Sequence, residues 1–295
     1  MFKATTLQQL PENLYALCLI LRQASQIIQQ QYVLYQQGDD FDIQQKQDDS
    51  PVTQADLLAN ESLTAALKDL APYYPVLSEE DVSVERHQWS TFWMIDPLDG
   101  TKEFIKKTCE FTVNLSLIQG GESVISALAI PMQNVVYIVE KGGLPFRWGW
   151  GETESIAEYQ TTLPAFAPRK NDVLKIAMSR RPQHNNQYTD FLDYLEDQQI
   201  AYEKISAGSA YKFCMMLEGK IDIYPRFHPT SEWDTAAGQG LLNSIGGELF
   251  ALDGKPFTYN QRDVLINSSF VAVRSTQDWQ IAADFLKQDQ RTKFE

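Results

Sequence analysis

One stretch of ten residues constrains the fold more than any other part of this chain: Trp93-Met94-Ile95-Asp96-Pro97-Leu98-Asp99-Gly100-Thr101-Lys102. Its apolar start predicts a strand, and its end predicts the beginning of a helix. Two carboxylates, Asp96 and Asp99, lie in the turn between them. Pro97 fixes its own φ and favours an extended Asp96, so the turn is predicted to be stiff.

The end of the same stretch has the features of a ligand site. Gly100 allows close backbone approach or a positive φ, and Thr101 is a favourable helix-capping residue. Two carboxylates and the carbonyl of Leu98 can bind a hard cation, and free N–H groups at the helix start can bind a phosphate. An ordinary strand–turn–helix junction, with Asp as a turn former, is the alternative at this point.

The composition limits the classes of function. A chain of 295 residues, 43% of them apolar, predicts a globular fold with one large domain or two smaller ones. The formal net charge of −14 argues against binding to nucleic acid and against attraction to an anionic membrane. A phosphate ligand therefore requires a local excess of positive charge, which bound divalent cations supply most simply.

The cysteines and the N-terminal region indicate the compartment. Cys18, Cys109 and Cys214 are widely separated and outside any CxxC motif, which is typical of a reduced, intracellular protein. The longest apolar run near the start, Leu14 to Leu21, is too short to cross a bilayer, so no integral membrane segment is expected. We expect a cytoplasmic monomer or homodimer, with peripheral association with the inner membrane left open.

The first half of the chain predicts two helices followed by a sheet. Leucines at helical spacing predict a helix over 8–34, and Thr53 can cap a second helix that ends near Leu70. Residues 36–52 predict a short strand pair with a loop. Further strands are predicted at 75–78, before three consecutive acids, and as an antiparallel meander at 113–117, 124–130 and 135–139. This half predicts an α+β layered unit.

The second half alternates strands with helices and predicts an α/β unit. The predicted elements are a strand at 174–178, a helix at 188–197, a helix that begins at Gly208-Ser209 and stops at Gly219, a strand at 221–224, a helix at 234–244 and a strand at 248–252. Residues 141–172 are rich in Gly, Pro, Trp and Thr without periodicity. We therefore predict two domains, 1–145 with the metal site and 146–295 with Asp234 and the substrate contacts. The role of 142–172 stays open.

Four acidic residues stand where an element begins or ends: Glu79, Asp96, Asp99 and Asp234. Taken singly, Asp234 reads as a helix N-cap and Glu79 as a solvated surface acid. The scattered histidines disfavour zinc, and the spacing of Asp96 and Asp99 does not fit an EF-hand. The aspartate-nucleophile DxDGT motif of haloacid-dehalogenase-like phosphatases fails too, because Pro97 or Leu98 falls where an acid is required.

Four motifs, taken together, resemble those of a known protein family. The motifs are Ser50-Pro51-Val52-Thr53-Gln54-Ala55-Asp56, Glu79-Glu80, Asp96-Pro97-Leu98-Asp99-Gly100-Thr101 and Trp233-Asp234-Thr235-Ala236-Ala237-Gly238. In this order they resemble the inositol monophosphatase superfamily of metal-dependent, lithium-sensitive phosphatases. A narrower resemblance is to bacterial 3′(2′),5′-bisphosphate nucleotidases of the CysQ type. It is carried by Val76-Leu77-Ser78-Glu79-Glu80-Asp81, Lys102-Glu103-Phe104-Ile105-Lys106, Glu110-Phe111-Thr112-Val113-Asn114, Gly208-Ser209 with Lys212-Phe213-Cys214, and Tyr224-Pro225-Arg226-Phe227 before Pro229-Thr230.

The resemblance implies a fold and a set of site residues. The fold is a layered αβαβα sandwich, of mixed α+β and α/β character, with two sheets flanked by helices. Two or three Mg²⁺ ions would be held by Glu79, Asp96, the Leu98 carbonyl, Asp99 and Asp234. The catalytic residues would be Asp56, Thr101 and Glu79, which activate the attacking water. The amides of Gly100 and Thr101 would bind the scissile phosphate, and the remaining substrate contacts would be Ser179, Ser209, Lys212 and Arg226.

The same resemblance implies a reaction. It is hydrolysis of the 3′-phosphate of adenosine 3′,5′-bisphosphate to AMP and phosphate, in sulfur assimilation, with the sulfated precursor nucleotide as a second substrate. An inositol- or sugar-phosphate phosphatase is the alternative within the superfamily. A non-catalytic protein that binds metal or nucleotide is the alternative from another class. Lys212 and Arg226 favour the nucleotide over a sugar phosphate, because a second, remote phosphate in an acidic site needs cations of its own. Taken singly, both are residues that ordinarily lie on the surface.

Overall fold

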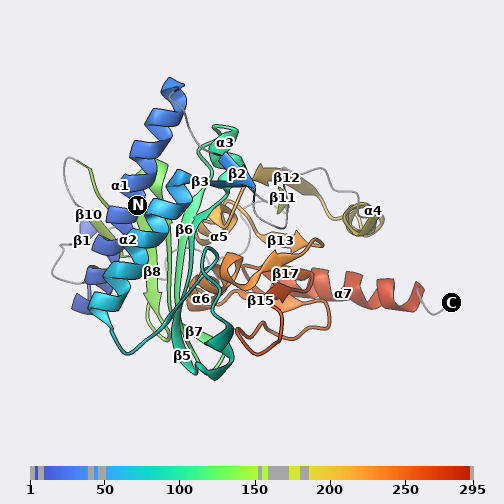
Figure 1. Ribbon diagram of the computed structural model, residues 1–295. Coiled ribbons are helices and arrows are strands. Elements are labelled where there is room, and N and C mark those ends of the chain that lie inside the picture. The colour runs from blue at the N-terminus through green and yellow to red at the C-terminus, as the bar shows by residue number, and fades with distance from the viewer. Residues whose placement is uncertain are drawn as a thin grey trace.

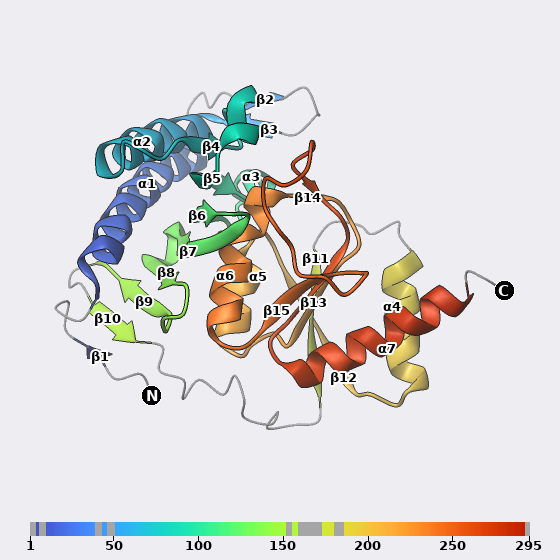
Figure 2. The same ribbon diagram turned by 90° about the horizontal axis from the view of Figure 1, so that it is seen from below.

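The computed structural model describes residues 4–5, 10–38, 43–45, 51–151, 155–158, 173–179 and 186–292. Its elements form five layers (Figures 1 and 2): a helix pair, a large sheet, a second helix pair, a smaller sheet and a third helix pair. This is the αβαβα sandwich that the resemblance implied. Among the described residues, no helix is both long enough and apolar enough to cross a membrane.

The first layer consists of α1 (Glu12–Gln37) and α2 (Gln54–Leu70). The predicted first helix is displaced by a few residues, because Pro11 precedes it and Gly38, at φ 82°, ends it. Thr53 caps α2 as predicted, with its hydroxyl accepting the N–H of Ala55 at 3.2 Å. The strands β2 (Ile43–Gln45) and β3 (Pro51–Thr53) form the short pair expected before α2.

The large sheet has the strand order β1-β10-β9-β8-β7-β6-β5-β4. The strands are β1 (Ala4–Thr5), β4 (Val76–Ser78), β5 (Thr91–Asp99), β6 (Thr112–Gln119), β7 (Glu122–Ile130), β8 (Val135–Glu140), β9 (Phe146–Gly149) and β10 (Ser155–Glu158). The predicted antiparallel meander is confirmed in β6–β8. The sheet continues past residue 145 through β9 and β10, while the division into two domains stays a prediction.

The smaller sheet has the order β12-β11-β13-β17-β15. Its strands are β11 (Leu174–Ser179), β12 (Tyr202–Ala207), β13 (Ile223–Arg226), β15 (Glu248–Ala251) and β17 (Phe270–Val273). The helices α4 (Asn186–Asp197) and α7 (Thr276–Thr292) cover its outer face (Figure 2). The predicted strand over 221–224 therefore lies two residues further along, at β13.

The helices α5 (Tyr211–Leu217) and α6 (Ala236–Ser244) lie between the sheets (Figure 2). Their apolar side chains share one buried core with side chains of both sheets. A Cβ on Gly238 would lie 2.2 Å from Cδ2 of Phe213, and one on Gly240 would lie 1.9 Å from Oγ of Ser126. The two glycines thus allow α6 to pack directly on α5 and on β7.

Several short elements connect the layers. They are η2 (Val84–Gln88), α3 (Thr101–Ile105), η3 (Pro131–Gln133), η4 (Glu232–Asp234) and the strand pair β14 (Thr230–Ser231) with β16 (Ile266–Asn267). The prediction of one helix over 234–244 was wrong at its start. A separate 3-10 turn, η4, ends at Asp234, and α6 begins two residues later.

Candidate active site

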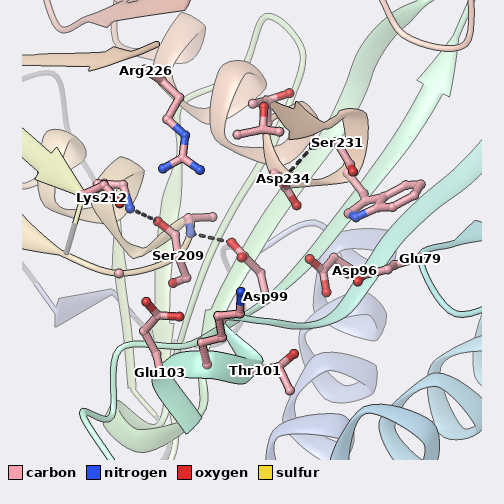
Figure 3. Close-up of a pocket in the computed structure, with 18 of the residues that line it drawn as sticks. Glu79, Asp96, Asp99, Thr101, Glu103, Ser209, Lys212, Arg226, Ser231 and Asp234 are labelled. Carbon is pink, nitrogen blue, oxygen red and sulfur yellow. Dashed lines mark hydrogen bonds between the residues drawn. The ribbon is translucent and has the colours of Figure 1, made fainter. Parts of the chain in front are cut away.

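A cavity of about 300 Å³ opens where the end of β5 faces the start of α5, the end of β13 and the turn η4. Figure 3 shows Glu79, Asp96, Asp99 and Asp234 grouped on one side, with Lys212 and Arg226 on another. All the site residues predicted from the sequence line this cavity except Asp56: Glu79, Asp96, Leu98, Asp99, Gly100, Thr101, Ser179, Ser209, Lys212, Arg226 and Asp234. Segments far apart in the chain therefore meet at one place.

Three carboxylates form a compact cluster in this cavity. One oxygen from each of Asp96, Asp99 and Asp234 lies within 4.8 Å of the others. The register of β5 against β6 breaks between Asp96 and Asp99, at the predicted turn, and Oδ1 of Asp96 accepts the N–H of Leu98 at 3.0 Å. Glu79 approaches from β4, where its N–H donates to the carbonyl of Ile95 at 3.2 Å. Such an all-oxygen set is suited to a hard divalent cation.

The cluster carries strongly unfavourable electrostatics. Burial raises the pKa of Asp96 well above its ordinary value, and the charges of Glu79, Asp99 and Asp234 raise it further. Burial, followed by Asp99 and Glu79, raises the pKa of Asp234 in the same direction. Burial also raises the pKa of Asp99, although the N–H of Ala210 and the charge of Lys212 oppose the shift. Proximity of like charges in a buried site is relieved by a bound cation.

Asp234 is not the helix N-cap that it seemed to be from the sequence. Its Oδ2 accepts the N–H of Ser231 at 2.8 Å and so closes the turn η4. The N-cap position of α6 is Thr235, and no side-chain bond caps that helix. The carboxylate of Asp234 therefore lies in the acidic cluster rather than on the helix end.

Thr101 is linked to Asp56, which lies outside the cavity wall. The Thr101 hydroxyl donates to Oδ1 of Asp56 at 2.9 Å, and Oδ2 of Asp56 accepts the N–H and the hydroxyl of Thr53 at 2.8 and 2.6 Å. The expected N-cap role of Thr101 is wrong, because Gly100, at φ 103°, occupies that position. Burial raises the pKa of Asp56, and its hydrogen bonds to Thr53 and Thr101 oppose this.

Lys212 and Arg226 are not the surface residues they resemble in isolation. Lys212 is 2% exposed, and its Nζ donates to the carbonyls of Ser209 at 2.6 Å and Ala207 at 3.2 Å. Burial, and then the charge of Arg226, lowers the pKa of Lys212 from 10.5 to about 8. Arg226 is 9% exposed, and within the described part of the chain its Nε is buried without a hydrogen-bond partner. Two buried cations thus face one cavity.

The turn before α5 brings Ser209 onto the wall of the site. Ser209 has φ 44°, and its hydroxyl accepts the N–H of Tyr211 at 3.1 Å. A Cβ on Gly100 would lie 3.1 Å from Cβ of Ser209, so the glycine allows the two turns to approach each other. Ser179 lines the same cavity from the end of β11.

Some residues that shape the site were not identified by sequence reasoning. Asn114 donates to Oδ2 of Asp99 at 3.4 Å and to the carbonyl of Trp233 at 3.2 Å, joining the β5 turn to η4. Glu232, with 0% exposure, accepts from the N–H of Asn260 at 2.6 Å and from Arg262 at 2.8 Å. Asn114 is the last residue of one motif that carried the resemblance, and Glu232 directly precedes another. Their position in or beside these motifs is the sequence signal that could have identified them.

Comparison with known proteins agrees with this geometry. Residues 10–290 match the model of the inositol monophosphatase family. The 3′(2′),5′-bisphosphate nucleotidase CysQ of Salmonella typhimurium is 36% identical over 255 residues, which cover 86% of this chain and 96% of that protein. The protein of the same name from Escherichia coli K12 is 35% identical over 256 residues, with the same shares of the two chains.

Solved structures show the same relationship. The crystal structure of CysQ from Bacteroides thetaiotaomicron, a bacterial member of the inositol monophosphatase family, has a TM-score of 0.71 and 31% identity, covering 90% of this chain and 98% of that one. The 2′AMP-bound SaIMPase-II has a TM-score of 0.69 at 19% identity, covers 92% of this chain and 94% of that one, and shares the fold. The chain belongs to the inositol monophosphatase family.

Proposed function

We propose that this protein is a Mg²⁺-dependent phosphatase that removes the 3′-phosphate from adenosine 3′,5′-bisphosphate and releases AMP and phosphate. The observation that carries the proposal is the composition of one cavity, with a carboxylate cluster at one side and the buried cations Lys212 and Arg226 at another. A substrate with two phosphates matches both sides. The relatives named as 3′(2′),5′-bisphosphate nucleotidases support the choice of substrate.

The residues present fit the metal. Asp96, Asp99 and Asp234 offer oxygens within 4.8 Å of one another. Burial and, after it, the charges of the neighbouring carboxylates raise the pKa values of Asp96 and Asp234, and a bound cation would balance those charges. Glu79 and the Leu98 carbonyl line the same cavity and complete the proposed ligand set for two or three ions. When bound, Mg²⁺ lowers the pKa of the attacking water and stabilises charge on the phosphoryl and leaving oxygens.

Thr101 and Asp56 are proposed to orient the attacking water. Because the Thr101 hydroxyl donates to Asp56, its oxygen is left to accept a hydrogen bond from a water molecule in the cavity. As the water attacks phosphorus, its proton can pass to Oγ1 of Thr101 while the Thr101 proton passes to Oδ1 of Asp56. The raised pKa of Asp56 makes that carboxylate a better proton acceptor. Glu79, which directly follows the neighbouring strand β4, is proposed to assist in activating the water.

The two phosphates are proposed to occupy different ends of the cavity. The amides of Gly100 and Thr101, at the start of α3, are proposed to donate to the scissile phosphate. Lys212 and Arg226 are proposed to bind the second phosphate, with Ser209 and Ser179 nearby. The guanidinium of Arg226 lines the cavity and points into it (Figure 3), and charge-assisted bonds to phosphate are strong.

The proposal is tested by initial rates of phosphate release with Mg²⁺, on adenosine 3′,5′-bisphosphate, inositol 1-phosphate and fructose 1,6-bisphosphate, with and without Li⁺. We expect a strong preference for the nucleotide and inhibition by Li⁺. Asp99→Asn and Asp234→Asn should abolish release, and activity that survives both changes would refute the mechanism. Binding of the nucleotide without turnover, measured by calorimetry, would instead indicate a non-catalytic protein.

A sugar-phosphate phosphatase is the second candidate, because the family model itself is that of inositol monophosphatases. The two candidates differ in what Arg226 does. For a bisphosphorylated nucleotide, Arg226→Ala should raise KM strongly, whereas for a substrate with a single phosphate it should leave turnover nearly unchanged. The sulfated precursor nucleotide should follow the same pattern as the bisphosphate if it is a further substrate.

A further inference from the structure

Glu103 is a buried carboxylate on the wall of the active site that the proposed mechanism does not use. Its side chain is 8% exposed, and it lines the cavity together with Ser209 and Lys212. Within the described part of the chain, no hydrogen bond or ion pair engages its carboxylate. Most polar groups on buried side chains are hydrogen-bonded, so a carboxylate that faces a cavity and bonds to none of the described residues requires an explanation.

Two local explanations fail. A Glu at the third position of a helix often reaches back to the N–H before the helix, but Gly100, the N-cap of α3, receives no side-chain bond. Lys212 is a cation on the same cavity wall, yet its Nζ donates to the carbonyls of Ala207 and Ser209 and not to Glu103. The carboxylate of Glu103 influences Lys212 only through space.

The side chain of Glu103 is nevertheless fixed in place. A Cβ on Gly208 would lie 2.4 Å from Cγ of Glu103, so the backbone of the 208–210 turn packs directly on this side chain. That turn is itself anchored, because the N–H of Gly208 donates to Oε2 of Glu110 at 2.8 Å. Figure 3 shows the Glu103 carboxylate pointing from α3 toward Ser209 and Lys212. It is a preorganised acceptor that faces the substrate cavity.

The chemistry of a carboxylate limits what can face it. An ionised carboxylate only accepts hydrogen bonds and repels phosphate, so the substrate group next to it must be a hydroxyl or an amine. Glu103 is on the same short helix as Thr101, at whose start the scissile phosphate is proposed to bind. In a nucleoside 3′,5′-bisphosphate, the donor closest to the 3′-phosphate is the ribose 2′-hydroxyl, on the adjacent carbon. The exocyclic amine of the base is much further away.

We infer that Glu103 accepts a hydrogen bond from the ribose 2′-hydroxyl and thereby selects ribonucleotides over 2′-deoxyribonucleotides. This rests on the proposed function. A hydrogen bond to a charged group changes kcat/KM by roughly 10- to 100-fold when it is lost. The wild-type protein should therefore favour adenosine 3′,5′-bisphosphate over 2′-deoxyadenosine 3′,5′-bisphosphate by a factor of that order.

The test measures kcat/KM for both nucleotides in the wild type, Glu103→Gln and Glu103→Ala. The ratio between the nucleotides should fall to near one in Glu103→Ala and to an intermediate value in Glu103→Gln, which keeps a neutral acceptor. A purely structural role would lower both rates and leave the ratio unchanged. Glu110→Gln is the matched control. It removes a charge that also acts on Lys212 through space, from a residue outside the cavity lining, while the amide oxygen can still accept the N–H of Gly208, so its ratio should match the wild type.

Each outcome has a distinct meaning. A wild-type ratio near one, or a wild-type ratio retained in both Glu103 variants, would overturn the role of Glu103 while leaving the proposed function intact. Absence of turnover of either nucleotide by the wild type would overturn the proposed function, and this inference with it. The wild-type ratio needs no variant, so the inference can be refuted even where Glu103→Ala does not fold.

Discussion

The hydroxyl of Thr101 donates to Oδ1 of Asp56 across 2.9 Å, and this bond joins the helix after β5 to the first turn of α2. If the pair orients and deprotonates water, Thr101→Val, which keeps the shape of the side chain, should lower kcat by roughly 10²- to 10⁴-fold with little change in KM. Steady-state kinetics test this. Thermal unfolding is the control, since a fall in kcat that accompanies a large loss of Tm would point to a structural role.

Because the clustered carboxylates repel one another, removing one of their charges should stabilise the metal-free protein and abolish its activity. Asp96→Asn removes one charge from the cluster, and its amide oxygen can still accept the N–H of Leu98. In metal-free solution we expect this variant to melt above the wild type, and a gain of about 1 kcal/mol corresponds to roughly 2–4 °C. Phosphatase activity should be lost.

Calorimetry in the presence of Mg²⁺ provides the control for this variant. Because ligands that bind only the folded state stabilise it, added Mg²⁺ should raise the Tm of the wild type and have little effect on Asp96→Asn. If metal-free Asp96→Asn melted well below the wild type, Asp96 would stabilise the fold, and its charge would not be a destabilising feature retained for metal binding.

Lys212 predicts a pH dependence of substrate affinity. With its pKa lowered to about 8, Lys212 loses its charge as the pH rises through 8, while the substrate phosphates, with a second pKa of about 6, stay fully ionised. KM for the bisphosphate should therefore rise above pH 8, with a limiting slope of about tenfold per pH unit. The profile of Lys212→Met should lack this rise and lie at a uniformly higher KM.

The same group affects folding in the opposite direction. Between pH 8 and 10.5 the unfolded chain binds the Lys212 proton while the folded chain does not, so this group makes the fold more stable as the pH rises through that window. Below pH 8 the buried charge lowers stability. Denaturant unfolding of the wild type and of Lys212→Met tests this, because the stability of the wild type relative to the variant should rise between pH 8 and 10.5. A relative stability that falls over that window would contradict the assignment.

Packing of α6 gives a prediction about stability alone. Gly240→Ala would place a methyl group 1.9 Å from Oγ of Ser126, and we expect a loss of roughly 1–3 kcal/mol in the free energy of unfolding. Adding Ser126→Ala should recover part of the loss, because it removes the closest atom. Gly151→Ala is the matched control, since nothing lies within 4 Å of the added carbon and the change should be nearly neutral. Denaturant unfolding measures all three.

The features that could be predicted from the sequence are those that a few consecutive residues determine. The strand–turn–helix at Asp96–Thr101 follows from ten consecutive residues, and the helix cap at Thr53 follows from four. The edge strand β12 escaped prediction because Glu203 and Lys204 interrupt any alternation of apolar residues. Contacts such as Asn114 with Trp233 join residues 119 positions apart, and no local pattern reports them.

Burial was the other property that the sequence did not reveal. Lys212 and Arg226 are residue types that usually lie on the surface. They are buried here because α5, which carries Lys212, packs between the two sheets and β13, which carries Arg226, lies inside the smaller sheet. Conversely, Asp234 looked like an ordinary helix cap because the 3-10 turn before α6 carries no distinctive spacing. In each case the tertiary arrangement, not the local preference, decides the environment of the side chain.

The distribution of the acidic cluster along the chain has a consequence for biosynthesis. Asp96 and Asp99 end a strand of the first sheet, whereas Asp234 precedes the helix that packs between the two sheets. At ribosomal speed, the interval between these segments is on the order of ten seconds. During that time a nascent chain can fold its first sheet but lacks one of the three clustered carboxylates. If the cluster binds Mg²⁺ as proposed, metal affinity and catalysis would be acquired together, late in synthesis, when the inner helices pack on the first sheet.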